Sequence, residues 1–568
     1  MSFIKENVLG DRFKVLGGIF LVLFIVLSVR LFQKQIIQSG QYKEIAQNQY
    51  LKVTELPSQR GNIFVKDLWE KEPYAVASNV HKYSVSVIPR NIKNPLDTAQ
   101  KLAKVLNLNE KELFNKINNK KPYLPPIAKK IDKIKAETIA SMKMVGVMIL
   151  PEEYRYYPEN GFMSTVLGFV DAEKQGRYGV EGFYNDELKG AVSKTSQSKL
   201  TDNINSLLTG NKSGDDIYLT IDHTVQYMAE KMLKARIDET QAESGSVLIA
   251  EPNGKILAMA NSSSYNPNEF NKVDDINVFN NQSTSYVYEP GSTFKAITMS
   301  AALDQNLVQP ETEGVFGASV KVRDRTIRTS TNEAYGRETM TQVLENSDNV
   351  AMVWVVYKLK QQLFSKYLSK FGFGERTGID LQNEVGGRVY DEKNMSQVSM
   401  STMAFGQGLS VTPLQLLNAY IALANNGKLM QPYITEKIVS PDGKTFERNP
   451  KEIAQVISSE TANKITQMLI SVVENGHGKK AAVPGYKVAG KTGTAQIPDL
   501  ENGGYLEHQN IGSFIGYFPA NNPRFVMLVK IDKPKTVAWA EESAAPLFGS
   551  LAKWLLEYYQ IPSTEPIK

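Results

Sequence analysis

The stretch YEPGSTFKAITMSAALDQ, residues 288–305, decides how the rest of the chain is interpreted. Pro290-Gly291 marks a turn, and the residues after it have the pattern of a helix. Ser292 and Lys295 therefore share one helix face, so the lysine amine can lie beside the serine hydroxyl. A serine hydroxyl is a weak nucleophile until a neighbouring base takes its proton. The pair predicts a nucleophile and its base, because burial and nearby positive charge both favour a neutral lysine.

The same spacing of serine and lysine also occurs elsewhere, so it is not specific by itself. The other pairs are Ser2/Lys5, Ser196/Lys199 and Ser550/Lys553. For any one such pair, chance pairing on a solvated helix is the plain interpretation. The surroundings of Ser292 set it apart.

A second polar motif, Ser347-Asp348-Asn349, interrupts two apolar helical runs in TMTQVLENSDNVAMVWVV (339–356). A third, Lys491-Thr492-Gly493-Thr494, lies in YKVAGKTGTAQI (486–497), which alternates like a strand and carries glycines where another segment can approach the backbone. Each has a structural alternative. The first could be a helix N-cap, and the second an ordinary edge strand.

All three motifs in this order are the signature of class A β-lactamases and penicillin-binding proteins. The chain resembles the class B penicillin-binding proteins, the monofunctional transpeptidases, over roughly residues 12–555. Its segments NPN, EPGSTFK and AGKTGTAQ are more similar to the division-type branch of this family than to the elongation-type branch. The matching stretches are RGNI (60–63), GRYGVEGFYNDELKG (176–190), GDDIYLTIDHTVQYMAE (214–230), NSSSYNPNEF (261–270), YEPGSTFKAITMSAALD (288–304), AFGQGLSVTPLQLLNAYIALANNG (404–427) and VAGKTGTAQ (488–496).

This resemblance implies a D,D-transpeptidase that cross-links peptidoglycan stem peptides ending in D-Ala-D-Ala, in septal cell-wall synthesis, and that β-lactams acylate. It needs neither a cofactor nor a metal. The roles it implies are nucleophile for Ser292, base for Lys295, and proton transfer for Ser347, which is linked to Lys295 and Lys491. It also implies that Asn349 binds the donor amide, that Lys491, Thr492 and Thr494 hold the terminal carboxylate, and that Gly493 belongs to the same substrate-binding group. The backbone N–H groups of Ser292 and Thr494 would form the oxyanion hole.

The composition limits the other possibilities. Among 568 residues, 65 basic and 60 acidic side chains are interleaved, which is weak evidence for a nucleic-acid partner, and we expect none. There is no cysteine, so disulfides, thiolate metal sites and a cysteine nucleophile are excluded. The four histidines (His81, His223, His477 and His508) show no metal-ligand spacing, and we interpret each as a surface or packing residue.

Residues 15–29, VLGGIFLVLFIVLSV, carry no charge and predict a membrane anchor. The apolar run extends to residue 32 if Arg30 snorkels to the interface. A cleaved signal peptide is the alternative, although no A-x-A-like site follows. The basic residues before the anchor favour a cytoplasmic tail at 1–14, an anchor at 15–32 and a single-pass protein whose bulk is extracytoplasmic.

The rest of the chain predicts an α+β protein of two further regions. We expect a β-rich and helical pedestal, similar to a dimerisation domain, at 33–205, with a helical head insertion at about 92–150. A linker rich in Ser, Thr, Asn and Gly precedes a transpeptidase domain at 206–560, built as an antiparallel sheet flanked by helices. The resemblance implies that the pedestal docks a SEDS-type glycan polymerase and divisome proteins. Arg60-Gly61 is then either a partner contact or a structural turn held by a salt bridge.

One misleading motif is rejected, and two rival interpretations remain. Residues 485–492 fit the P-loop pattern, but no hydrophobic strand precedes them and Gly and Pro follow where a helix should begin. A β-lactamase-like hydrolase would share the acylation step, but the anchor and the long region before residue 210 argue against it. A β-lactam sensor or scaffold that is only acylated should have lost a motif residue, and none is missing.

Overall fold

The computed structural model describes residues 17–18, 21–38, 54–56, 59–70, 72–121, 124–190, 193–195, 213–499 and 503–566. The chain divides into two compact units, one of Met1–Gln59 with Ala191–Ser213, and one of Arg60–Gly190 with Gly214–Lys568. The predicted tail at 1–14 and most of the predicted linker lie outside the described residues.

In the first unit, residues 21–32 are helical and continue into the π-helix η1 (Gln33–Ile37). Strand β1 (Thr54–Leu56) pairs antiparallel with β8 (Ser193–Thr195). Among the described residues, no helix combines the length and the apolar character that crossing a membrane requires.

The second unit contains an antiparallel sheet in the order β11-β10-β22-β21-β20. Its strands alternate between two apolar faces, as in β10, where Val247 and Ile249 join one core and Leu248 and Ala250 join the other. The strands are β10 (Ser244–Ala250), β11 (Ile256–Asn261), β20 (Ala489–Pro498), β21 (Tyr505–Phe518) and β22 (Phe525–Asp532). Strands β10 and β11 form a hairpin, and Gly254 in the turn between them has a φ of 92°.

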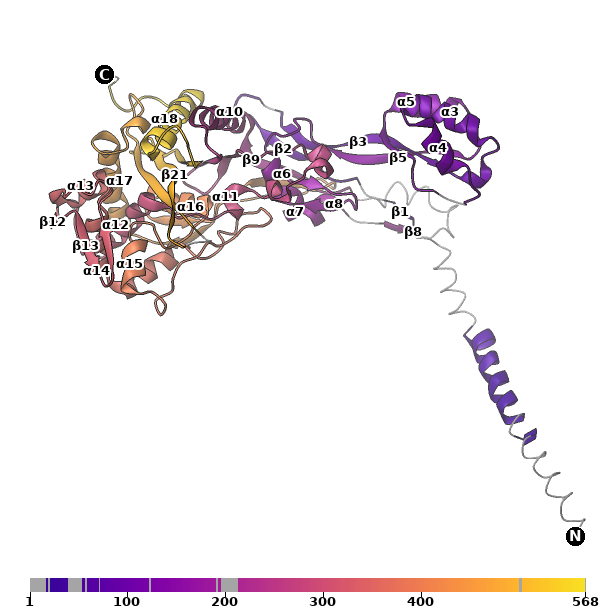
Figure 1. Ribbon diagram of the computed structural model, residues 1–568, viewed down its shortest axis with the longest axis horizontal. Coiled ribbons are helices and arrows are strands. Elements are labelled where there is room, and N and C mark those ends of the chain that lie inside the picture. Colours follow the sequence, from indigo (N-terminus) through magenta and orange to yellow (C-terminus); the bar gives the residue numbers. More distant parts are fainter. Residues whose placement is uncertain are drawn as a thin grey trace, which may run out of the picture. The chain divides into compact units, whose positions relative to one another are not determined.

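Helices cover both faces of this sheet (Figure 1). On one face lie α10 (His223–Thr240) and α18 (Ala540–Tyr558), whose side chains Leu233, Phe548 and Leu551 are buried. On the other lie α12 (Lys295–Asp304), α16 (Pro413–Ala424) and α17 (Ser459–Glu474). The predicted α+β domain with an antiparallel sheet between helices is therefore confirmed.

A second sheet has the order β18-β17-β9-β2-β3-β4, with β5 also paired to β3. Its strands are β2 (Ile63–Lys66), β3 (Tyr74–Val87), β4 (Ala128–Ile131), β5 (Val147–Tyr156), β9 (Asp216–Asp222), β17 (Thr435–Val439) and β18 (Thr445–Glu447). Strand β2 pairs parallel with β9, and the other pairs are antiparallel. The sheet thus contains strands from both sides of the boundary that the sequence suggested at residue 205.

Helices α3 (Pro95–Leu106), α4 (Glu110–Ile117) and α5 (Lys133–Ser141) gather at one end of β3 and β5 (Figure 1). They form an apolar cluster of their own, in which Leu102, Leu113 and Ile139 pack with Val85 of β3. Asn94 caps α3 and Asn109 caps α4. The three helices lie within residues 92–150, the range in which the sequence predicts a helical insertion.

The remaining elements connect these layers. The helices are α6 (Ser164–Leu167), α7 (Gly179–Phe183), α8 (Asn185–Lys189), α11 (Gln282–Ser285), α13 (Met340–Glu345), α14 (Asn349–Lys370), α15 (Gln397–Met403), η2 (Pro89–Asn91), η4 (Pro267–Lys272), η5 (Ile276–Phe279), η6 (Gly291–Phe294) and η7 (Lys479–Ala481). Two-stranded pairs are β6 (Phe169–Val170) with β7 (Gly176–Arg177), β12 (Glu313–Phe316) with β15 (Gly336–Thr339), β13 (Ser319–Val322) with β14 (Arg325–Arg328), and β16 (Lys428–Met430) with β19 (Glu452–Gln455).

Arg60 belongs to a buried ion cluster. The Glu181 side chain is fully buried, and its carboxylate accepts hydrogen bonds from Arg60 Nε at 2.8 Å and from Arg155 Nε at 2.6 Å. Burial alone would raise the pKa of Glu181, but the charges of Arg155 and Arg60 hold it below its usual value. Gly61 packs so tightly that a Cβ there would lie 1.9 Å from the Asp215 carbonyl oxygen. Of the two interpretations of Arg60-Gly61, the geometry favours the structural turn.

Candidate active site

Ser292 lies in η6, a 3₁₀ turn that leads directly into α12. The Lys295 backbone N–H donates to the Ser292 carbonyl, so the two residues are one 3₁₀ turn apart and their side chains leave the turn on the same side. Ser292 is partly exposed, whereas Lys295 is fully buried. The turn therefore presents the hydroxyl to a pocket and keeps the amine behind it.

Two buried lysines meet at one serine hydroxyl. The Nζ atoms of Lys295 and Lys491 each lie 3.1 Å from Ser347 Oγ. Lys295 Nζ also donates to the Ser347 carbonyl, and Lys491 Nζ donates to the Thr492 carbonyl at 3.2 Å. The structure thus brings together three of the four residues to which the sequence assigned catalytic roles, and the fourth, Ser292, lines the same pocket as Ser347.

Burial explains the electrostatics of both amines. It lowers the pKa of Lys295 well below its usual value, and the positive charge of Lys491 lowers it further, against the opposing charges of Asp348 and Glu338. Burial also lowers the pKa of Lys491 to about 7, with the charge of Glu541 acting in the opposite direction. A lysine with a lowered pKa has a neutral amine that can accept a proton.

Ser347 occupies the short turn between α13 and α14 in the left-handed region, with a φ of 56°. That conformation is costly for a residue with a side chain, so neighbouring contacts must hold it. Asp348 supplies one of them, because its Oδ1 accepts from the backbone N–H groups of Val350 at 2.6 Å and Ala351 at 3.2 Å. The helix-cap alternative for this motif is therefore correct for Asp348, and the same cap fixes the turn that carries Ser347.

The Lys491 motif lies on β20, beside the nucleophile turn. A Cβ at Gly493 would lie 2.8 Å from Thr293 Cγ2 and 2.9 Å from the Pro290 carbonyl oxygen, so only glycine lets the strand come this close to η6. Thr492 and Thr494 both line the pocket, and Thr494 Oγ1 accepts from the Ala540 N–H at 3.1 Å. The strand therefore forms one wall of the site.

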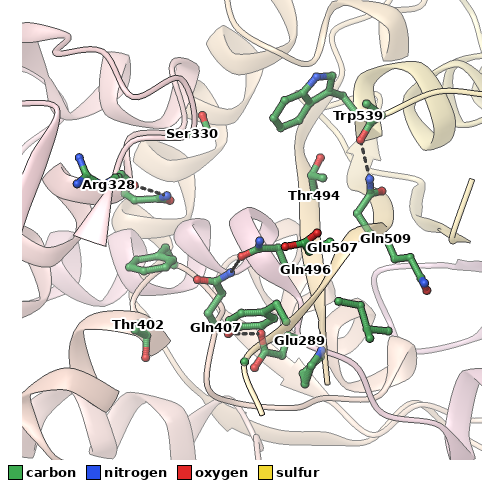
Figure 2. Close-up of a pocket in the computed structure, with 18 of the residues that line it drawn as sticks. Glu289, Arg328, Ser330, Thr402, Gln407, Thr494, Gln496, Glu507, Gln509 and Trp539 are labelled. Carbon is green, nitrogen blue, oxygen red and sulfur yellow. Dashed lines mark hydrogen bonds between the residues drawn. The ribbon is translucent and has the colours of Figure 1, made fainter. Parts of the chain in front are cut away.

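The pocket at Ser292 has a volume of about 350 Å³ and opens into a larger cleft. Shared residues of the two include Asn349, Gln407, Thr494 and Trp539. Figure 2 shows the cleft, with Arg328 and Ser330 on one side, Thr494 and Trp539 on the other, and Glu289 beside Gln407. Asn349, predicted to bind a donor amide, lines this space and donates from Nδ2 to the Arg328 carbonyl at 3.0 Å.

Two residues of the pocket, His477 and Glu541, were not indicated by the sequence. His477, interpreted as a surface or packing residue, lines the pocket at Ser292, and its Nδ1 lies 2.9 Å from Glu541 Oε2. Glu541 lines the pocket as well. No local pattern marks either residue, because they come from the loop after α17 and from the start of α18.

The rival motifs lie in other settings. Lys491, where a P-loop would begin its helix, is in the strand β20, which agrees with the rejection of nucleotide binding. Lys553 of the Ser550/Lys553 pair is an exposed side chain of α18 that faces Glu557. The pairs Ser2/Lys5 and Ser196/Lys199 fall outside the described residues.

Comparison with known proteins matches two adjoining domain families. The penicillin-binding protein dimerisation domain matches residues 55–219, and the penicillin-binding protein transpeptidase domain matches residues 245–553. Stage V sporulation protein D of Bacillus subtilis is 34% identical over 558 residues, covering 95% of this chain and 84% of the relative. Peptidoglycan D,D-transpeptidase FtsI of Buchnera aphidicola is 28% identical over 569 residues, covering 97% and 95%.

Solved structures agree in fold. Penicillin-binding protein 3 of Mycobacterium tuberculosis, complexed with aztreonam, superposes with a TM-score of 0.70 at 25% identity, covering 90% of this chain and 98% of that chain. Fold and site together define a serine-type transpeptidase. The chain belongs to the class B penicillin-binding proteins, which combine a dimerisation domain with a transpeptidase domain.

Proposed function

We propose that this protein is a peptidoglycan D,D-transpeptidase that cross-links stem peptides through a serine acyl-enzyme, in septal cell-wall synthesis. The observation that carries the proposal is the meeting of Lys295 and Lys491 at the Ser347 hydroxyl, in the pocket that Ser292 lines. The names of the relatives support the reaction. The similarity of the motif sequences to the division-type branch supports the septal role.

In the first step, Ser292 Oγ attacks the carbonyl of the penultimate D-Ala and forms an ester. Lys295, neutral because it is buried beside Lys491, takes the hydroxyl proton. The peptide C–N bond then breaks. Ser347, held by the two lysines, passes its proton to the departing amine of the terminal D-Ala and takes up the proton that Lys295 accepted. The first product is free D-Ala.

In the second step, an amine from another stem peptide attacks the ester carbonyl, and Ser292 leaves with its proton restored. The amine loses a proton to the same Lys–Ser–Lys chain, so the site returns to its starting state. The cross-link is the new amide bond. A hydrolase would use water here instead.

Binding groups surround these reacting atoms. The backbone N–H groups of Ser292 and Thr494 form the oxyanion hole, where fixed donors stabilise the developing negative charge. Lys491, Thr492 and Thr494 hold the terminal carboxylate from the wall formed by β20. Asn349, which lines the same pocket, binds the donor amide.

Full-length protein, a donor stem peptide ending in D-Ala-D-Ala and a second peptide bearing a free amine test this reaction. The proposal predicts release of D-Ala together with a cross-linked product of donor plus acceptor mass. A parallel incubation with penicillin distinguishes the alternatives. A sensor or scaffold would bind the penicillin but release no D-Ala from the peptide, and a β-lactamase-like enzyme would release hydrolysed penicillin at a steady rate. Either of those outcomes contradicts the proposed reaction.

We also propose that residues 15–32 anchor the protein as a single membrane pass, with the bulk outside the cytoplasm, and that the pedestal docks a SEDS-type glycan polymerase and divisome proteins. The helical residues 21–32 support the anchor, because their apolar side chains are exposed. A fragment from about residue 45, exported to the same compartment, should be acylated by penicillin but should fail to replace the full chain in a depletion strain. Growth with the fragment would contradict the anchoring role.

A further inference from the structure

A buried acid lies behind the Ser347 turn. Glu338, near the end of β15, is only 2% exposed. Its Oε1 accepts from Asn346 Nδ2 at 2.8 Å, but none of the described residues donates a hydrogen to its buried Oε2. A buried carboxylate oxygen without a donor is costly, so its surroundings require an explanation.

Asp348 has the same incomplete pattern. It is fully buried, its Oδ1 caps α14, and in the described part of the chain no group donates to its Oδ2. The two carboxyl groups interact with each other, side chain to side chain. Two ionised carboxylates can only accept hydrogen bonds, so this contact is satisfied when one of them holds a proton and donates it to the other.

Asn346 and Asp348 are the two neighbours of Ser347. Glu338 therefore contacts the residue on each side of the one serine that lies in the left-handed conformation between Lys295 and Lys491. A single buried side chain thus holds both ends of the strained turn. The contacts of Glu338 therefore constrain the turn that carries Ser347, in addition to filling space in the core.

We propose that Glu338 is a positioning residue of the transpeptidase: as a protonated acid it donates to Asp348 and accepts from Asn346, so that it fixes Ser347 between the two lysines and leaves the carboxyl pair with one negative charge. The inference rests on the proposed function for the meaning of Ser347, but the clamp itself rests on the contacts of the pair.

The charge of the pair matters because of the groups that face it. Lys295 of α12 faces both carboxyls, and Lys491 of β20 faces Lys295, with Glu541 of α18 beyond it. On the other neighbouring elements, Glu345 of α13 accepts from Ser471 of α17, and Arg337 of β15 pairs at the surface with Glu313 of β12. Lys295 is therefore the cation that responds directly to a change in the pair.

Burial, together with the contact to Asp348, raises the pKa of Glu338 to about 7. Above that pH the pair loses its proton and gains a second negative charge. The added charge favours the ammonium form of Lys295, which cannot act as a base. Below about pH 7 the proton on the pair therefore favours the neutral form of Lys295.

Glu338→Gln separates this role from simple packing. The amide can donate to Asp348 and accept from Asn346, so it keeps the clamp but removes the titration. Acylation of full-length protein by a fluorescent penicillin should be similar to wild type at pH 6. The midpoint of the rise of the acylation rate with pH should lie lower in the variant than in wild type, by up to about one unit, because an ionised Glu338 raises the pKa of Lys295 whereas the amide does not.

Two more variants complete the design. Glu338→Ala removes both contacts and should lower acylation at every pH, so that Gln rescues what Ala loses. Glu313→Gln, the same change at an exposed position on the neighbouring strand, should follow the wild-type profile. A midpoint for Glu338→Gln equal to that of wild type would overturn the charge role, and an Ala variant equal to wild type would overturn the clamp.

A measurement on the wild type covers the case in which Glu338→Gln does not fold. Infrared spectra at pH 6 should contain the carbonyl band of a buried, protonated carboxylic acid that disappears as the pH is raised to 9. Absence of any such band overturns the shared proton. If penicillin acylates no residue of folded protein, the proposed function fails instead, and the infrared result still tests the pair.

Discussion

Two groups of buried charged side chains resolve the cost of burial in opposite ways. Around Glu181, one carboxylate lies between two guanidinium groups and stays ionised, because Arg60 and Arg155 compensate its charge. Around Ser347, two amines of like charge lie together, and burial lowers the pKa of both. Two cations offset the cost of burying the Glu181 carboxylate, which can then stabilise the fold as an ion. The carboxyl groups near the two lysines do not offset the cost of burying the amines, so these amines can be neutral and act as bases. The comparison predicts that equivalent substitutions in the two groups have different consequences.

Glu181→Gln should have the largest effect on stability. It leaves Arg60 and Arg155 buried without a counter-charge, and breaking a buried pair in this way costs about 3–5 kcal/mol. Chemical unfolding measures the change, with the exposed Glu173→Gln as the matched control. Protein that remains folded should be acylated by penicillin at a normal rate. A stability loss no greater than that of the control would show that the ion cluster around Glu181 does not stabilise the fold.

Lys295→Arg should have the largest effect on reactivity. The positive charge is kept, but guanidinium stays protonated and cannot accept the Ser292 proton. We expect acylation to slow by at least about 10²-fold, the lower end of general-base effects. Lys553→Arg, in the exposed Ser550/Lys553 pair, is the control and should change nothing. Near-normal acylation of the Lys295 variant would remove this residue from the base role.

Lys491→Met should abolish acylation yet stabilise the fold. With a folded pKa of about 7 against a usual 10.5, the native state disfavours the charged amine. That penalty is fully present below pH 7 and fades as pH rises toward 10.5, because the unfolded chain binds more protons in this window. The variant should gain about 1 kcal/mol or more at pH 6, and the gain should shrink by pH 9.

Thermal unfolding at the two pH values measures this difference, and the exposed Lys480→Met is the control. A gain that increased with pH would contradict the assignment of a lowered pKa. Glu181→Gln should lower the free energy of unfolding, whereas Lys491→Met should raise it. The two variants together therefore distinguish a buried charge that its neighbours offset from one that they do not.

The sequence was most informative where residues close together in the chain determine the geometry of the site. The spacing of Ser292 and Lys295 implies one turn of helix, and the structure has that turn. The order of the three motifs identified the family, although neither Ser347 nor Lys491 could be placed beside Lys295 by periodicity alone. For Asp348 the helix-cap alternative held, and the cap turned out to support the site.

The other contacts of the site depend on packing between distant elements. Glu338 belongs to a short edge strand and pairs with Asp348 only because β15 leads into α13. His477 reaches the pocket from the loop after α17 and meets Glu541 of α18. The joining of β2 to β9 in one sheet likewise crosses the composition change that suggested a domain boundary. Residue patterns describe single elements, and these contacts arise only when the elements pack.

The proposed mechanism depends above all on Ser292, made nucleophilic by a buried lysine pair, being the residue that becomes acylated. Labelling of folded protein with penicillin, followed by digestion and mapping by mass spectrometry, measures this. We expect one adduct, on the peptide that contains Ser292, and none on a protein carrying Ser292→Ala. An adduct on another serine, or labelling that survives Ser292→Ala, would show that Ser292 is not the nucleophile.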